Sequence, residues 1–144
     1  MIDLIPSLPS TTAALDAEST RLQIISQNIA NANTTHNVDG RPYQRQQVVF
    51  ESVLQHAQGK DGSSTTLAVP QVSRIEKDTR PGTAAYQPGH PDADANGMVQ
   101  FPNVNIYEEM ADMIVASRTY DANVAAFKNG RSIAMQALSI GKHG

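Results

Sequence analysis

The sequence contains no cysteine, and this absence removes several kinds of chemistry at once. Without thiols there is no disulfide framework, no cysteine nucleophile and no cysteine-ligated zinc or iron–sulfur site. A chain free of cysteine also suits a protein that passes from a reducing to an oxidising compartment, although many cytosolic proteins share this property.

Aromatic and charged residues are also scarce. The chain has no tryptophan, and aromatics make up 5% of its 144 residues, so its middle cannot build a large aromatic core. Charged residues make up 17%, against about 25% in an average soluble domain. This shortfall fits either a surface covered by neighbouring molecules or ordinary variation. The net charge of -3 and the lack of a Lys/Arg cluster argue against nucleic-acid binding.

Long apolar runs are missing as well. No stretch approaches about 18 consecutive apolar residues, so the sequence predicts no transmembrane helix. The first residues, Met1 to Pro6, lack a basic region followed by an apolar run. We therefore expect no cleavable signal peptide, and export, if it occurs, must use another route.

The two ends of the chain carry a helical signal that the middle lacks. Apolar residues are separated by steps of three and four and their multiples, the spacing of helices that pack lengthwise on other helices. They are Leu15, Leu22, Ile25 and Ile29 near the start, and Ile106, Met110, Met113, Tyr120, Val124, Phe127, Ala134 and Leu138 near the end. We predict an α+β fold in which long N- and C-terminal helices form a coiled-coil-like pair beside a small β-rich middle. The corresponding parts are residues 1–33, 34–102 and 103–144.

Capping residues predict where these helices begin and end. Pro6 and Pro9 disfavour a helix interior, so Ser10 is the expected N-cap, and the helix should run to about Asn31. In the second helix, Asn105 followed by Glu108 is close to a capping box, with Asn replacing Ser or Thr.

Turn residues and alternating apolar residues divide the middle into short strands. Pro70 places the second of these strands at an edge or a bulge. The segment Ser52–Gln58 remains ambiguous. The expected elements are strands at Tyr43–Glu51, Leu67–Ile75, Ala84–Gln87 and Met98–Phe101, with a hairpin tip at Gly59–Ser64.

One segment imitates a calcium site. Asp92, Asp94, Asn96 and Gly97 match the first half of an EF-hand loop, but the twelfth position is Asn103 instead of a bidentate Glu. The segment also follows Pro-Gly-His-Pro and not a helix. We interpret it as a turn built by Asp and Asn side chains, and we expect no calcium binding.

No other catalytic or metal-binding pattern is present. The four histidines, at positions 36, 56, 90 and 143, share no metal-ligand spacing, and neither a Gly-x-Ser-x-Gly nor a Walker pattern occurs. Glu108 and Glu109 point about 100° apart on a helix, and we interpret them as partners of the helix dipole. The sequence therefore predicts no enzyme, no cofactor and no bound metal.

Several segments resemble the family of flagellar axial proteins. Ser26–Thr34, which reads SQNIANANT, resembles an element near the N-terminus of rod and hook proteins. Four further segments are similar, in the same order, to rod members of that family, and the resemblance covers nearly the whole chain. These are Gly40–Phe50, Gly89–Gly97, Pro102–Met110 and Met113–Val124. The proline-containing start departs from the family pattern.

The resemblance implies a structural subunit of the bacterial flagellar basal body, in the proximal rod. Such subunits self-assemble helically through terminal helices that line the inner tube, and they transmit torque across the periplasm. They leave the cytoplasm through the flagellar type III export apparatus without signal cleavage. The implied partners are copies of the chain, other rod proteins and that apparatus, with no nucleic acid and no small-molecule substrate.

We assign the assembly interface to apolar helix positions and to motif asparagines. The predicted interface residues are Leu15, Leu22, Ile25, Asn28, Ile29, Asn31, Asn103, Asn105, Met110, Met113, Tyr120, Val124, Phe127 and Leu138. The alternative is a soluble helical-hairpin adaptor, which would be a well-folded monomer. A small calcium-dependent or hydrolytic enzyme is disfavoured because no catalytic set is found.

Overall fold

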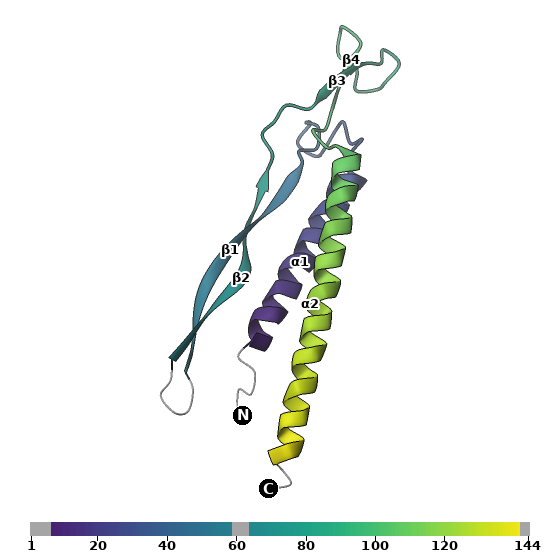
Figure 1. Cartoon of the computed structure of the whole chain (residues 1–144). Helices are drawn as coiled ribbons and strands as arrows, with labels where there is room; N and C mark the ends of the chain where they lie inside the picture. Colours follow the sequence, from purple (N-terminus) through teal and green to yellow (C-terminus); the bar gives the residue numbers. More distant parts are fainter. Residues whose placement is uncertain (1–6, 59–63, 142–144) are drawn as a thin grey trace.

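The two terminal helices of the protein lie side by side, with the strands at one side and at one end (Figure 1). The computed structural model describes residues 7–58 and 64–141. Its elements are α1 (Ser7–Ala30), β1 (Gln46–Gln58), β2 (Ser64–Lys77), β3 (Thr83–Tyr86), β4 (Met98–Phe101) and α2 (Ile106–Gly141). The predicted α+β fold, with paired terminal helices and a β-rich middle, is confirmed.

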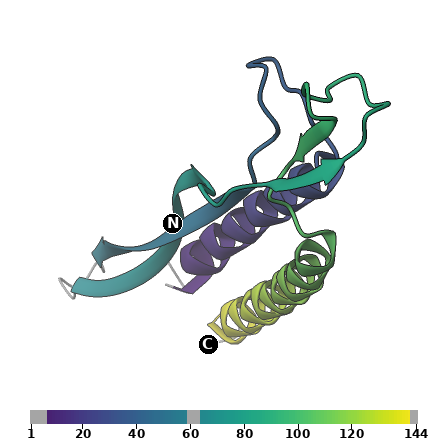
Figure 2. The ribbon, with the colours of Figure 1, turned by 90° about the horizontal axis from the view of Figure 1, so that it is seen from above.

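Helix α1 is the central layer of the molecule. It lies between the β1–β2 hairpin and α2, as the view from above shows (Figure 2). Ala17, Ile24 and Ile25 are each at most 6% exposed, so α1 supplies much of the small core. Helix α2 has 36 residues against 24 in α1 and extends past the start of α1 (Figure 1). Among the residues that are described, no helix is long and apolar enough to span a membrane.

The predicted start of the first helix is wrong. Ser10 is not the N-cap, because α1 already includes Ser7 and runs through Pro9. Proline is tolerated in the first turn, where its missing N–H would have no intrahelical partner. Ser10 instead donates a hydrogen bond from its hydroxyl to the carbonyl of Ala68 on β2, at 3.4 Å.

Strands β1 and β2 form the predicted antiparallel hairpin, although its details differ. β1 begins at Gln46, three residues later than expected, and it includes the ambiguous segment Ser52–Gln58. Pro70 pairs with Ser52 in an edge strand, while the bulge lies at Ser73, which the register leaves unpaired between Arg74 and Val72. The predicted tip falls largely at residues 59–63, outside the described part of the chain.

Strands β3 and β4 form a second small hairpin at the end of the molecule where α2 begins (Figure 1). β4 has the predicted bounds, and β3 begins and ends one residue earlier than expected. Gly82 allows the two strands to approach, because a Cβ on this residue would lie 1.9 Å from the carbonyl oxygen of Phe101. Gly97 adopts a φ of 74°, a conformation that favours glycine.

Candidate assembly surface and the polar junction that positions it

The segment that imitates a calcium loop is a hydrogen-bonded turn. Asp94 Oδ1 accepts hydrogen bonds from the backbone N–H groups of Asn96 and Met98, at 2.8 and 2.9 Å. Asp92 accepts a bond of 2.6 Å from the Thr35 hydroxyl, which ties this turn to the loop after α1. Across residues 7–58 and 64–141, no group of three His, Asp or Glu residues is placed to hold a metal ion.

Asn28 is the centre of a buried polar junction between α1, β1 and α2. Its side-chain amide pairs with the backbone of Gln46 like a strand neighbour: Nδ2 donates to the Gln46 carbonyl at 2.8 Å, and Oδ1 accepts from the Gln46 N–H at 2.9 Å. Nδ2 also donates to Glu109, and Oδ1 accepts from the Tyr43 hydroxyl, both at 2.9 Å. All four hydrogen-bonding positions of this amide are therefore satisfied, which allows the residue to be 1% exposed.

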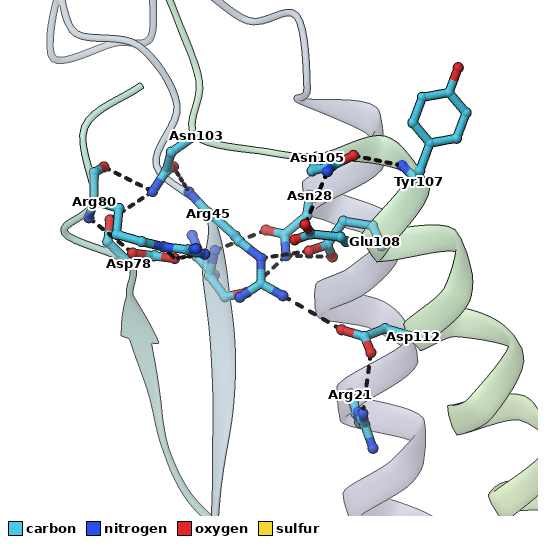
Figure 3. Close-up of polar contacts among 12 residues, drawn as sticks. Arg21, Asn28, Arg45, Asp78, Arg80, Asn103, Asn105, Tyr107, Glu108 and Asp112 are labelled. Atoms are coloured by element: carbon cyan, nitrogen blue, oxygen red, sulfur yellow. Dashed lines mark hydrogen bonds and ion pairs between the residues drawn. The ribbon is translucent and has the colours of Figure 1, made fainter. Parts of the chain in front are cut away.

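Glu109 connects the junction to α2 and is fully buried. One carboxylate oxygen accepts from Asn28 and the other from Arg45 Nε, at 2.6 Å. Arg45 also lies 3.6 Å from Asp112, which in turn lies 4.0 Å from Arg21 on α1 (Figure 3). A buried carboxylate requires such partners, because an unpaired charge in the interior is costly. The prediction that Glu109 acts only as a dipole partner therefore missed its main role.

Asn103 holds the segment before α2 against the hairpin. Its Oδ1 accepts from the backbone N–H of Arg45 at 2.8 Å, and its Nδ2 donates to the carbonyls of Asp78 and Arg80 at 3.2 and 3.1 Å (Figure 3). Hydrogen bonds from Arg80 lower the pKa of the Asp78 carboxyl below its usual value. The side chain of Asn103 thus joins three chain segments that are distant in sequence.

Asn105 caps α2 as the sequence predicted, by a variant of the expected geometry. Its Oδ1 accepts from the backbone N–H of Tyr107 at 3.1 Å, while its Nδ2 donates to the Glu108 side chain at 3.1 Å (Figure 3). In the usual capping box the Glu side chain would bond to the backbone of the capping residue. Asn31 directly follows α1. Its Nδ2 donates to the Gln27 carbonyl in the last turn of that helix.

The phenol of Tyr43 is a weaker acid in this structure than in water. The side chain is removed from water and lies near the Glu109 carboxylate, and both effects raise the pKa of the phenol above 10.0. The neutral hydroxyl is therefore the form that donates to Asn28.

The apolar positions predicted for the interface are divided between the helix pair and the surface. Ile25 is buried, and seven others are half-buried: Leu15, Leu22, Ile29, Met113, Tyr120, Val124 and Phe127. Met110 and Leu138 are both 53% exposed and lie outside the intramolecular core. Their part in assembly remains a prediction.

Sequence reasoning missed Glu109, Ala116 and Val99, which are all 0% exposed. Ala116 follows Glu109 by seven residues and continues one face of α2, so heptad spacing contained a signal for this pair. Nothing in the local sequence distinguished the buried Glu109 from the exposed Glu108. The difference arises from contacts with Asn28 on α1 and with Arg45, which directly precedes β1.

Helix α2 also carries large apolar side chains that α1 does not cover. The exposed members with at least half of their surface accessible are Tyr107, Met110, Ile114, Val115, Ile133, Met135, Leu138 and Ile140. Many exposed apolar side chains on one helix are typical of a surface that binds another protein.

Comparison with known proteins gives consistent matches over most of the chain. The family described as flagella basal body rod protein matches residues 10–36, and the family described as flagellar basal body rod FlgEFG protein C-terminal matches residues 95–140. The flagellar basal-body rod protein FlgC of Agrobacterium fabrum is 40% identical over 89% of this chain and 88% of its own. The FlgC proteins of Yersinia enterocolitica and Bacillus subtilis are 38% and 36% identical, over 90% and 94% of this chain and 92% and 97% of theirs.

The residues of the polar junction fall largely within the two matched regions. Asn28 lies in the first region, and Asn103, Asn105 and Glu109 lie in the second. The two regions that match family models thus both contribute residues to the contact between α1 and the start of α2.

Proposed function

This chain belongs to the FlgC family of flagellar basal-body rod proteins, and we propose from that premise that its α1–α2 pair is the element through which copies join. The protein is a structural subunit of the rod and not an enzyme. The observation that supports the role of the helices is the apolar surface of α2 that α1 leaves exposed. A neighbouring helix would remove this surface from water.

The polar junction has a mechanical role in this proposal. Arg45, Asn28 and Glu109 connect the hairpin, α1 and α2, so a force applied to one element is passed to the other two. A subunit that transmits torque needs such fixed angles between its elements. The division into residues 1–33, 34–102 and 103–144 then separates two assembling helical parts from a middle that sets their geometry.

The place and partners of the subunit follow from the family assignment. We expect the rod that contains this chain to cross the periplasm, and we expect the chain to be exported by the flagellar type III apparatus without a cleaved signal peptide. Its partners are copies of itself and other rod proteins, and the assembly is helical. The predicted interface residues, from Leu15 to Leu138, remain the proposed contact set.

Replacing Leu22 by Asp tests the role of the helices. The charge enters a half-buried position of α1 at a cost of several kcal/mol, so we expect export to continue and swimming to stop. The matched control is Gln23→Asp, which places the same charge at the neighbouring exposed position and should leave swimming normal. Motility and secretion of complemented cells are the measurements. Normal swimming with Leu22→Asp would mean that the pairing of the terminal helices is not needed for assembly.

A further inference from the structure

The two outer edges of the β1–β2 hairpin are covered to different extents. Near its start, α1 lies against β2, where the Ser10 hydroxyl donates to the carbonyl of Ala68. Near its end, α1 lies against β1, where the Asn28 amide bonds to both backbone groups of Gln46. Further along β1, every residue from Phe50 to Leu54 is exposed. Helix α1 thus crosses the hairpin and leaves this part of the β1 edge open.

The open edge presents backbone groups without partners. Residues of an antiparallel strand point their N–H and C=O groups alternately toward and away from the partner strand. Both groups of Gln46 point away from β2, and the extra residue of the bulge lies on β2, so the alternation along β1 continues. Pro70 agrees with it, because proline has no N–H and occupies an outward position opposite Ser52. The outward residues of β1 are Val48, Phe50, Ser52 and Leu54, and nothing in the described part of the chain bonds to their outward groups.

Strand β1 lacks the features that usually protect a free edge. Exposed edge strands are generally short, or they carry Pro, Lys or a bulge that prevents another strand from pairing. β1 has 13 residues and contains neither Pro nor Lys. The outer edge of β2, in contrast, is interrupted by Pro70. The open edge of β1 is therefore a place where an extended chain can add.

The side chains beside this edge define the segment that fits it. A groove of about 330 Å³ lies between β1 and α1, and its apolar lining is Val48, Phe50, Ile24 and Ile25. The charged side chains that also line the groove are paired with one another. Glu51 is exposed and forms no ion pair with any side chain that the structure describes. The edge thus combines an apolar groove with one free carboxylate.

We propose that the outer edge of β1 binds an extended segment of another protein, which adds to the hairpin as a third strand. This segment has apolar side chains at alternate positions, which face the groove, and a Lys or Arg on its other face, beside Glu51. The inference goes beyond the joining of copies. The hairpin of a second copy does not fit the description, because its β2 edge contains Pro70 and its β1 contains no Lys or Arg.

A synthetic peptide tests this site on the purified full-length chain. The probe is a nonapeptide with blocked ends, in which Thr and Val alternate and the central Thr is replaced by Lys. We expect saturable binding in a calorimetric titration. Amide exchange followed by NMR should slow at Phe50 and Ser52, whose N–H groups point outward, and should change little at Val49 and Glu51, whose N–H groups point toward β2.

Matched variants separate strand addition from apolar adhesion. Ser52→Pro removes an outward N–H and no bond within the hairpin, so it should weaken binding about tenfold, whereas Ser52→Ala keeps the N–H and should bind as the natural chain does. Glu51→Lys should weaken binding of the Lys peptide about threefold and favour a peptide with a central Glu. A peptide N-methylated at alternate residues cannot pair along that edge and should not bind the natural chain, a control that needs no protein variant.

Four results would overturn the proposal. They are absence of binding at millimolar peptide, equal binding of the N-methylated peptide, equal affinities of Ser52→Pro and Ser52→Ala, and slowed exchange confined to residues outside β1. Sedimentation of the chain alone tests the other occupant. A dimer that Ser52→Pro abolishes would assign the edge to a second copy and would also overturn the proposal. The rod function is tested separately by Leu22→Asp, on α1, so the two failures are distinguishable.

Discussion

At the scale of single residues, the fold depends on a few side chains that join distant segments. Asn28 and Glu109 are 81 positions apart in sequence, and both are almost completely buried. Their hydrogen bonds keep polar groups satisfied in an interior that contains few large apolar side chains. In such a junction, removing one member leaves several partners unpaired, and the cost exceeds that of one hydrogen bond.

Replacing Asn28 by Ala should therefore destabilise the protein by at least about 3 kcal/mol. The change removes partners from Glu109, Tyr43 and both backbone groups of Gln46. Asn31→Ala, in the same sequence motif, is the control. Because Asn31 is only half-buried and bonds locally to Gln27 and Thr34, its loss should cost less than about 1 kcal/mol. Urea unfolding followed by circular dichroism measures both variants, and equal costs would mean that the junction is not a stabilising centre.

Tyr43 gives a prediction for alkaline pH. Its raised pKa means that the folded state holds the phenolic proton more tightly than the unfolded state does. The resulting stabilisation is complete below pH 10 or so and is lost as the pH rises through the folded-state pKa. In an absorbance titration of the protein, a late component should appear, because the Tyr43 phenol ionises at a higher pH than a phenol in water. Tyr43→Phe should remove that late component, and its persistence in the variant would contradict the assignment.

At the scale of elements, regular patterns were predictable and pairings between elements were less so. Heptad spacing and the Asn105 cap predicted α2, and alternation with turn residues predicted the strands, because these signals are local. The bulge at Ser73 depends on how β2 aligns with β1, and the burial of Glu109 depends on its contacts with Asn28 and Arg45, which are distant in sequence. Such features come from tertiary contacts that no local pattern contains.

The close approach of β3 and β4 gives a prediction at this scale. A methyl group added at Gly82 would collide with the backbone of Phe101, so Gly82→Ala should separate the strands and cost about 2 kcal/mol. Gly89 is the matched control, because a Cβ there meets no atom within 4 Å, and Gly89→Ala should change stability by less than about 0.5 kcal/mol. Thermal unfolding measures the stability of both variants. A Gly82→Ala protein as stable as the Gly89→Ala protein would show that the strands separate without cost.

At the scale of the whole molecule, the chain is a poor candidate for an isolated globular protein. Few side chains are fully buried among the residues that the structure describes, while α2 alone presents eight large apolar side chains to solvent at 50% exposure or more. Burial of this surface between subunits would provide the stabilisation that the small core lacks. In the sequence, the low charge fitted this arrangement and ordinary variation equally, and no pattern predicted the polar junction that joins α1 to α2.

The most direct test of the account is an electron cryomicroscopy map of basal bodies in which this chain is the FlgC subunit. The account predicts that α1 and α2 lie in the inner tube of the rod, with the exposed apolar side chains of α2 in contact with neighbouring subunits and with Asn28, Arg45 and Glu109 joined as described. A rod in which the middle segment makes the subunit contacts, while α2 faces solvent along its length, would contradict it.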